Sequence, residues 1–175
     1  STRLINRAAW ENVKALSAKA GCTPSIALIS VFAETMSFWA KENRYTINLT
    51  HFDRPPINPA IYDAVADFTN ILLVPVDTDQ CGTVQDLLHY IRKQLGDSID
   101  KSFCGGVEAL RAIRMARGGD IAFPVVFTSK LNVSNRDSFV GTWLGERLFG
   151  VSQTPQVELD FQVEEINGGL NIVVD

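Results

Sequence analysis

The segments PVVFTS, residues 124–129, and SQTPQVELD, residues 152–160, decide how this chain folds. The first is an apolar run that ends in Thr128 and Ser129. The second leads through alternating polar and apolar residues to Asp160. Short runs of this kind, bounded by turn residues, are typical of β-strands. We therefore expect two strands that carry hydroxyl, amide and carboxylate groups to one place, and we expect the upstream chain to be its scaffold.

The upstream chain alternates helical and strand patterns. Apolar residues at helical spacing predict four helices, over residues 10–20, 24–39, 84–95 and 106–117. We expect the second to be buried all round, because it is apolar on nearly every side. Gly21, Gly96 and the pair 118–119 are placed to end three of these helices. Thr23 followed by Pro24 begins the second one.

Strand patterns occupy the remaining segments. Alternation predicts a half-buried strand over 45–50, and the apolar run 70–76 predicts one buried on both faces, with Pro75 favouring an edge position. A buried strand over 121–127 would present Thr128 and Ser129 at its carboxyl end. Further strands are expected over 143–151, 156–164 and 170–174, the last two joined by a type I′ turn at Asn167-Gly168. The chain therefore reads as one α/β unit.

Composition excludes several classes of function. The chain has 175 residues, enough for one core or for one lobe of a larger enzyme, and its net charge of −4 provides no basic field for nucleic acid. No apolar run reaches the length of a membrane span. Three cysteines without C-x-x-C spacing predict reduced thiols in a cytoplasmic protein. His51 and His89 share no motif, so we expect no metal site.

The candidate residues taken singly each allow two interpretations. Thr128 is placed where ligands of α/β sheets bind, but a threonine at a strand end also commonly caps a turn. Asp160 could serve chemistry or simply lie on the solvated face of a hairpin. Asp67 could act at a site or fix a turn through its carboxylate. No nucleophile elbow, P-loop or G-x-G-x-x-G is present to decide among them.

Three segments in order resemble a known family. Residues 66–69 (ADFT), 124–129 and 152–160 are similar to the later core motifs of heterocyclization domains of nonribosomal peptide synthetases, a branch of the condensation-domain superfamily. Residues 21–25 and 49–56 resemble the same family. Ala66 stands where family members usually have Gly, and Asp53 where they often have Asn.

The resemblance implies the fold of a chloramphenicol acetyltransferase-like lobe, a mixed sheet flanked by helices. It implies that residues 1–175 are the C-terminal lobe of such a domain, without the N-terminal lobe and the final helix. Both ends of the chain accordingly look cut. The active site of the family lies in a tunnel between the two lobes, so we expect the isolated lobe to be inactive.

The resemblance also implies a reaction and roles for residues. A carrier-bound acyl or peptidyl thioester is condensed with carrier-bound Cys, Ser or Thr, and loss of water closes a thiazoline or oxazoline ring. The implied catalytic residues are Asp160, as general acid and base, and Thr128, which orients Asp160 or the substrate. Gln153 and Ser129 are implied to line the tunnel. Asp67, in the ADFT motif with Thr69, is implied to support the site.

The implied partners are peptidyl or aryl carrier protein domains and the N-terminal lobe of the same domain. No cofactor is expected to bind directly, because the substrates are tethered to the phosphopantetheine of the carriers. A siderophore pathway is the expected setting. The resemblance leaves open which of Cys, Ser or Thr is cyclised and what the upstream acyl group is. Alternatives are a lobe of an ordinary condensation or epimerization domain, and a non-catalytic docking platform for carrier proteins.

Overall fold

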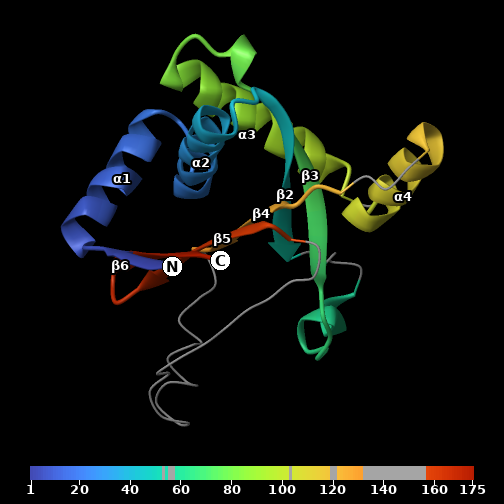
Figure 1. The fold of residues 1–175 in the computed structure, drawn as a ribbon. Helices are drawn as coiled ribbons and strands as arrows, with labels where there is room; N and C mark the ends of the chain where they lie inside the picture. Colours follow the sequence, from blue (N-terminus) through green and yellow to red (C-terminus); the bar gives the residue numbers. More distant parts are fainter. Residues whose placement is uncertain (53, 55–57, 103, 119–121, 132–156) are drawn as a thin grey trace.

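A single mixed β-sheet organises the computed structural model, which describes residues 1–52, 54, 58–102, 104–118, 122–131 and 157–175. Within these residues the strand order is β1-β6-β5-β4-β2-β3 (Figure 1). The strands are β1 (Thr2–Ile5), β2 (Arg44–Phe52), β3 (Thr69–Asp77), β4 (Val125–Lys130), β5 (Leu159–Ile166) and β6 (Gly169–Val174). The central pairs β2–β4 and β4–β5 are parallel, whereas β1–β6, β5–β6 and β2–β3 are antiparallel.

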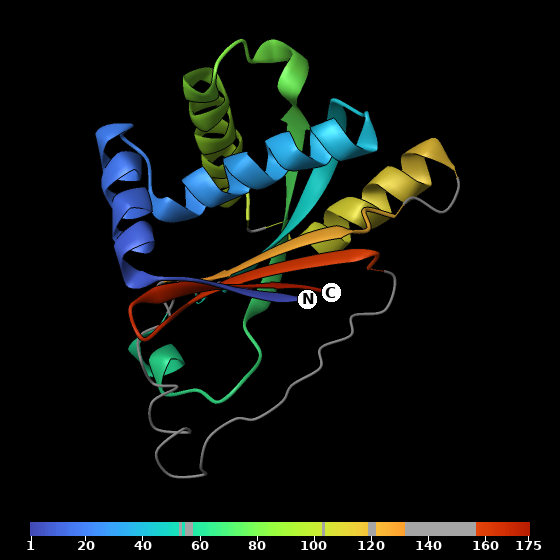
Figure 2. The same cartoon turned by 60° about the vertical axis from the view of Figure 1, so that its left-hand side comes forward.

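Helices cover one face of this sheet. The helices are α1 (Arg7–Lys19), α2 (Pro24–Ala40), α3 (Val84–Asp100) and α4 (Gly106–Arg117), with short 3-10 helices η1 (Pro59–Tyr62) and η2 (Thr78–Gln80). Helices α1, α2 and α3 lie together above the sheet, and α4 lies beside the edge strand β3 (Figures 1 and 2). The other face therefore carries none of the four α-helices.

Side-chain caps fix where the first three helices begin. The side chains of Asn6, Thr23 and Thr83 accept hydrogen bonds from backbone N–H groups in the first turns of α1, α2 and α3. Such caps satisfy donors that have no partner within the helix. Gly21 follows α1 with φ +69°, a conformation that favours glycine, and lets the chain turn into α2.

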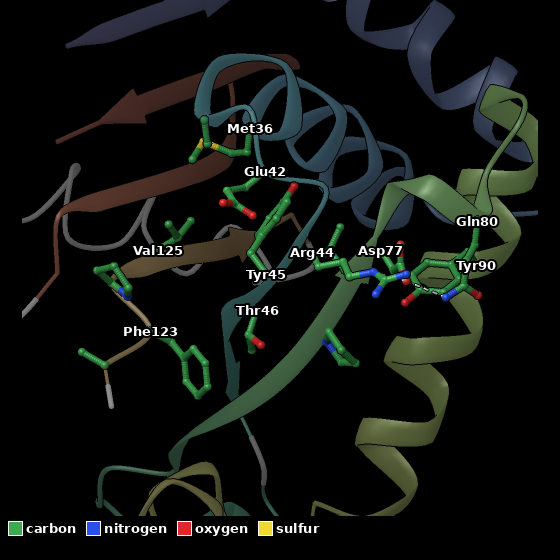
Figure 3. A pocket seen from close by; sticks show the side chains of 15 residues that line it. Met36, Glu42, Arg44, Tyr45, Thr46, Asp77, Gln80, Tyr90, Phe123 and Val125 are labelled. Atoms are coloured by element: carbon green, nitrogen blue, oxygen red, sulfur yellow. Dashed lines mark hydrogen bonds and ion pairs between the residues drawn. The ribbon is translucent and has the colours of Figure 1, made fainter. Parts of the chain in front are cut away.

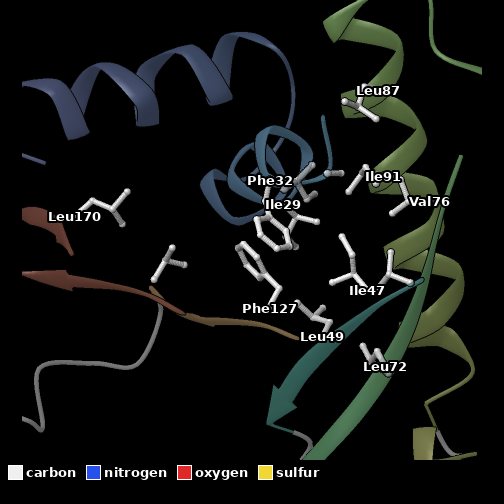
Figure 4. Close-up of a cluster of buried hydrophobic side chains, with 14 of the residues drawn as sticks. Ile29, Phe32, Ile47, Leu49, Leu72, Val76, Leu87, Ile91, Phe127 and Leu170 are labelled. Carbon is white, nitrogen blue, oxygen red and sulfur yellow. The ribbon is translucent and has the colours of Figure 1, made fainter. Parts of the chain in front are cut away.

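The core fills the space between the sheet and α1 to α3 (Figure 4). Its centre is an aromatic group in which Phe127 of β4 stacks on Phe161 of β5, with ring centroids 5.5 Å apart. Phe32 of α2 packs on both rings. Near the carboxyl end of β5 the buried Trp10 of α1 donates its indole N–H to Glu165, at 2.8 Å. These contacts fix α1 and α2 over β5.

Most of the predicted elements are confirmed. The four helices, the strands around 45–50, 70–76 and 170–174, and the edge position of Pro75 are all found. Asn167 and Gly168 join β5 to β6 with φ +52° and +78°, as a type I′ turn requires. The predicted strand over 143–151 lies outside the described residues.

Two predictions of burial are wrong, for the same reason. Helix α2 is not buried all round, because Val31, Phe38 and Trp39 are exposed on the side away from the sheet. Strand β3 is not buried on both faces: its alternate residue Leu72 is buried, whereas Pro75 is exposed. The apolar composition of both segments predicted burial on every side, but only one side of each element faces the core.

Two predicted elements have other boundaries, and one strand was not predicted. Helix α3 continues past Gly96 to Asp100, and its last turn is held by Ser98, whose hydroxyl donates to the Leu73 carbonyl at 3.2 Å. Strand β4 begins only after Pro124 and includes Thr128 and Ser129, which therefore lie within the strand and not at its exit. The N-terminal strand β1 was not predicted; its four residues pair with β6, at the far end of the chain.

Among the described residues, no single helix combines the length and the apolar character needed to cross a membrane. Helices α1 and α2 reach that length and apolar character only when they are taken together, and the two are bent by 96° relative to each other.

The contact between α4 and β3 yields a stability prediction. A Cβ atom on Gly106 would lie 2.3 Å from the carbonyl oxygen of Ile71, so Gly106→Ala must displace α4 from the sheet edge. We expect a loss of about 1–3 kcal/mol in the free energy of unfolding, measured by urea denaturation. Gly96→Ala is the matched control, because a Cβ there meets nothing within 4 Å. It should stabilise α3 by about 0.5–1 kcal/mol. Equal effects of the two substitutions would contradict the close approach.

Candidate functional site

Thr128 and Asp160 lie on the two adjacent parallel strands at the centre of the sheet. The register pairs Val126 with Asp160 and Thr128 with Gln162. Side chains alternate between the faces of a strand, so Thr128, Asp160 and Gln162 share the face opposite Phe127. Thr128 and Asp160 are nevertheless only 8% and 7% exposed. The register thus brings a buried hydroxyl and a buried carboxyl group together with the half-buried amide of Gln162.

The two oxygens of Asp160 have different surroundings. Gln162 Nε2 donates a hydrogen bond to Oδ2 at 2.7 Å. Oδ1 is buried and has no hydrogen-bond partner among the described residues. The backbone of Asp160 is fixed by paired hydrogen bonds with Asp175, at 2.9 and 3.1 Å. The carboxyl group is therefore held by its main chain and by one oxygen, and its other oxygen makes no hydrogen bond among the described residues.

Thr128 is held from the opposite side of the site. Its hydroxyl shares a hydrogen bond of 2.9 Å with the hydroxyl of Thr50 in β2, the residue paired with it across the parallel ladder. Within the described part of the chain, the hydrogen bond to Asp160 comes from Gln162, and Thr128 makes none to that carboxylate. Among the described residues, the Thr128 hydroxyl therefore contacts β2 and not the carboxyl group of Asp160.

Ser129 is not brought into this group. It follows Thr128 in the strand and therefore lies on the opposite, helix-covered face. Its hydroxyl shares a 3.0 Å hydrogen bond with Ser25, in the first turn of α2. The contact ties β4 to the start of that helix. Gln153, the other residue expected in the tunnel, lies outside the described residues.

Asp67 and Thr69 form a separate local motif before β3. The Thr69 N–H donates to Asp67 Oδ1 at 2.9 Å, and hydrogen bonds from Thr69 lower the pKa of the Asp67 carboxyl below its ordinary value of 3.8. Thr69 pairs with Phe52 of β2, so strand β2 separates it from Thr128 in β4. Both Asp67 and Thr69 are exposed. Their contacts therefore fix the entry of β3 and do not reach the buried carboxylate.

A pocket of about 710 Å³ lies elsewhere, beside the end of α2. Met36 of α2, Tyr45 of β2 and Val125 of β4 line it (Figure 3). Neither Thr128 nor Asp160 is among its lining residues. Its lining mixes apolar side chains with charged ones, among them Glu42 and the ion pair of Arg44 with Asp77, at 3.1 Å. The candidate site is thus defined by the polar face of the strands and not by this pocket.

No group of three or more His, Cys, Asp or Glu residues within the described part of the chain could hold a metal ion. All three cysteines are free, with Cys22 and Cys81 partly buried and Cys104 exposed. Burial raises the pKa of the Cys22 and Cys81 thiols, which disfavours the thiolate form that binds metals and attacks electrophiles.

Three polar residues of the site were not predicted from the sequence. They are Gln162, which contacts Asp160; Lys130, whose ammonium donates to Gln162 Oε1 at 3.3 Å; and Thr50, which contacts Thr128. A signal for two of them was present, because Lys130 and Gln162 each stand two residues after a candidate and so share its strand face. Thr50 could not be placed without knowing that β2 pairs with β4.

Relatives and solved structures place this chain in a family, although no family model matches it. Pyochelin synthetase PchF of Pseudomonas aeruginosa is 34% identical over 170 residues, which are 96% of this chain and 9% of that protein. Phenyloxazoline synthase MbtB of Mycolicibacterium paratuberculosis is 35% identical over 151 residues, or 86% of this chain and 13% of that protein. The chain therefore spans only about a tenth of each of these relatives.

A solved structure agrees with these relatives. The cyclization-docking bidomain of the nonribosomal peptide synthetase EpoB from Sorangium cellulosum superposes with a TM-score of 0.81 at 29% identity, over 100% of this chain and 36% of that one. The mixed sheet flanked by helices is thus the chloramphenicol acetyltransferase-like fold expected from the sequence. The chain belongs to the heterocyclization domains of nonribosomal peptide synthetases, within the condensation-domain superfamily.

Proposed function

We propose that this chain is the C-terminal lobe of a heterocyclization domain, and that its polar sheet face forms one wall of the site. The domain condenses a carrier-bound acyl or peptidyl thioester with carrier-bound Cys, Ser or Thr and then cyclodehydrates the product to a thiazoline or oxazoline. The observation that carries the proposal is the buried carboxylate of Asp160, next to an ordered hydroxyl and amide on one strand face. The likeness to cyclization domains supports it.

The proposed chemistry needs proton transfer at three atoms of the substrate. The side-chain thiol or hydroxyl attacks the new amide carbonyl: its sulfur or oxygen forms a bond to carbon and gives up its proton, and the carbonyl oxygen takes up a proton. The C–O bond then breaks, and the oxygen leaves as water after receiving a second proton. The ring nitrogen loses its proton, and the electron pair of that N–H bond forms the C=N bond. A placed carboxyl can deliver and recover these protons.

We assign the proton transfers to Asp160 and substrate positioning to Thr128. Asp160 Oδ1 has no hydrogen-bond partner among the described residues, so this oxygen keeps its capacity to bond to a substrate. The Thr128 hydroxyl, held by Thr50, can donate to or accept from a bound amide. Ser129 faces α2 and is assigned no chemical role.

The partners that follow from this proposal are carrier protein domains and the N-terminal lobe of the same domain. The substrates arrive on the phosphopantetheine of those carriers, so the domain itself needs no bound cofactor. The three free cysteines fit a reducing compartment, and we place the domain in the cytoplasm. The names of PchF and MbtB support a siderophore or related oxazoline pathway as the setting.

Substitution of the two central residues tests the proposed reaction. In the full domain with loaded carrier proteins, Asp160→Ala should slow ring closure by about 10²- to 10⁴-fold, because it removes the general acid and base. Thr128→Ala should also slow ring closure. Intact mass spectrometry of the carriers should then show the linear condensed product accumulating without the loss of water.

The same experiment separates the alternative functions. A docking platform would give no condensed product from the full parent domain, and an ordinary condensation domain would give only the linear amide. Ser129→Ala is the matched control: it removes a neighbouring hydroxyl on the opposite face and should leave ring closure at the parental rate. Ring closure at the parental rate in both Asp160→Ala and Thr128→Ala would contradict the roles assigned to them.

Asp67 is proposed to support the site indirectly, by fixing the start of β3. Because its folded-state pKa lies below 3.8, its contribution to stability is present above that value and is lost as the pH falls through the lowered pKa. We therefore expect Asp67→Ala to lower the urea midpoint at neutral pH. The difference from the parent should shrink as the pH falls below 3.8. A difference that does not change with pH would show that the carboxylate makes no such contribution.

A further inference from the structure

The hydrogen bonds around Asp160 form an ordered chain that begins at Lys130. The Lys130 ammonium donates to Gln162 Oε1 at 3.3 Å, and Gln162 Nε2 donates to Asp160 Oδ2 at 2.7 Å. Lys130, Gln162 and Asp160 lie on one face of β4 and β5, since Thr128 pairs with Gln162 and Lys130 with Glu164. The three groups thus run along the strands towards the buried carboxylate.

Lys130 decides which way the amide of Gln162 points. An amide can present either its oxygen or its NH₂ group to a neighbour, whereas an ammonium can only donate. Lys130 therefore selects the orientation in which Oε1 faces the ammonium and the NH₂ group faces Asp160. In the flipped orientation, two oxygens would meet at Asp160 and two donors would meet at Lys130.

We propose that Gln162, oriented by Lys130, is a positioning residue that anchors Asp160 by Oδ2 and reserves Oδ1 for proton exchange with the substrate. This inference rests on the proposed cyclodehydration and assigns its proton transfer to one atom. Oδ2 is occupied by the Gln162 donor, and Oδ1 has no partner among the described residues. The same anchor fixes the plane of the carboxyl group, and with it the direction in which Oδ1 points.

In the loss of water, the carboxyl group of Asp160 gives one proton through Oδ1 and receives one in return. A proton on Oδ1 passes to the oxygen of the tetrahedral ring intermediate as its C–O bond breaks, and that oxygen leaves as water with the bonding electrons. The ring nitrogen gives up its proton to the carboxylate, and the N–H electron pair completes the C=N bond. The carboxyl is regenerated, and Oδ2 keeps its hydrogen bond to Gln162 throughout.

The test compares ring closure with condensation in the same reaction. In the full domain with loaded carriers, we expect Gln162→Met to lower the ratio of cyclised to linear product by roughly 10- to 100-fold, because a misplaced acid loses about this much rate. Gln162→Glu keeps the length of the side chain but replaces the donor with an oxygen, so it should not restore the ratio. Lys130→Met should lower the ratio less, because the amide then has a choice of orientations.

Asn171 provides the matched control. It is buried on the same sheet face, and its Nδ2 donates to Glu164 Oε1 at 2.9 Å, which is also an amide–carboxylate contact. Asn171→Leu removes a comparable hydrogen bond away from Asp160 and should leave the ratio at the parental value. A merely structural role for Gln162 would lower condensation and ring closure together, as general destabilisation does, and would not change the ratio.

The outcomes separate the two proposals. A parent domain that forms no ring contradicts the proposed function. A parent that cyclises, together with a Gln162→Met variant of unchanged ratio, contradicts the positioning role alone. If Gln162→Met yields no soluble domain, the variant Lys130→Met, at a half-buried position, decides. A lowered ratio of cyclised to linear product supports the positioning role, and a parental ratio overturns it.

Discussion

The parallel pairing of β4 with β5 is the constraint on which the rest of the structure depends. Its register sets Val126 beside Asp160 and Thr128 beside Gln162 on one face. On the other face the same register stacks Phe127 on Phe161. A shift of one residue would exchange the two faces, bringing the carboxylate into the core and the aromatic rings out of it. The packing of Phe32 on the rings therefore also secures the polar group.

The buried carboxyl group of Asp160 is only partly compensated by hydrogen bonds. Burying a charged group is unfavourable unless hydrogen bonds replace those to water. One oxygen of Asp160 has such a bond from Gln162, whereas Oδ1, among the described residues, has none. A half-satisfied buried carboxylate reduces the stability of the fold. By contrast, the Ser129 hydroxyl shares a hydrogen bond with Ser25 and so ties β4 to the start of α2.

The sequence predicted local features well and neighbour relationships poorly. Thr23 before Pro24, and Asn167 before Gly168, act through adjacent residues, so their cap and turn could be read directly. Thr128 and Asp160 could be named because family motifs contain them, and their strand faces follow from alternation. Thr50 was missed because its role depends on β2 pairing with β4, across 78 residues. The exposure of Trp39 and the pairing of β1 with β6 depend on tertiary contacts in the same way.

The pairing of β1 with β6 also has a consequence for the order of folding. Thr2 pairs with Val173, and β6 in turn lies against β5 through the pair of Phe161 with Val174. Because proteins are synthesised from the N-terminus, β1 must wait for nearly all of this chain before its partner exists. Contacts of such long sequence separation slow folding. The ladder that holds the backbone of Asp160 is therefore among the last parts of this sheet to be completed on the ribosome.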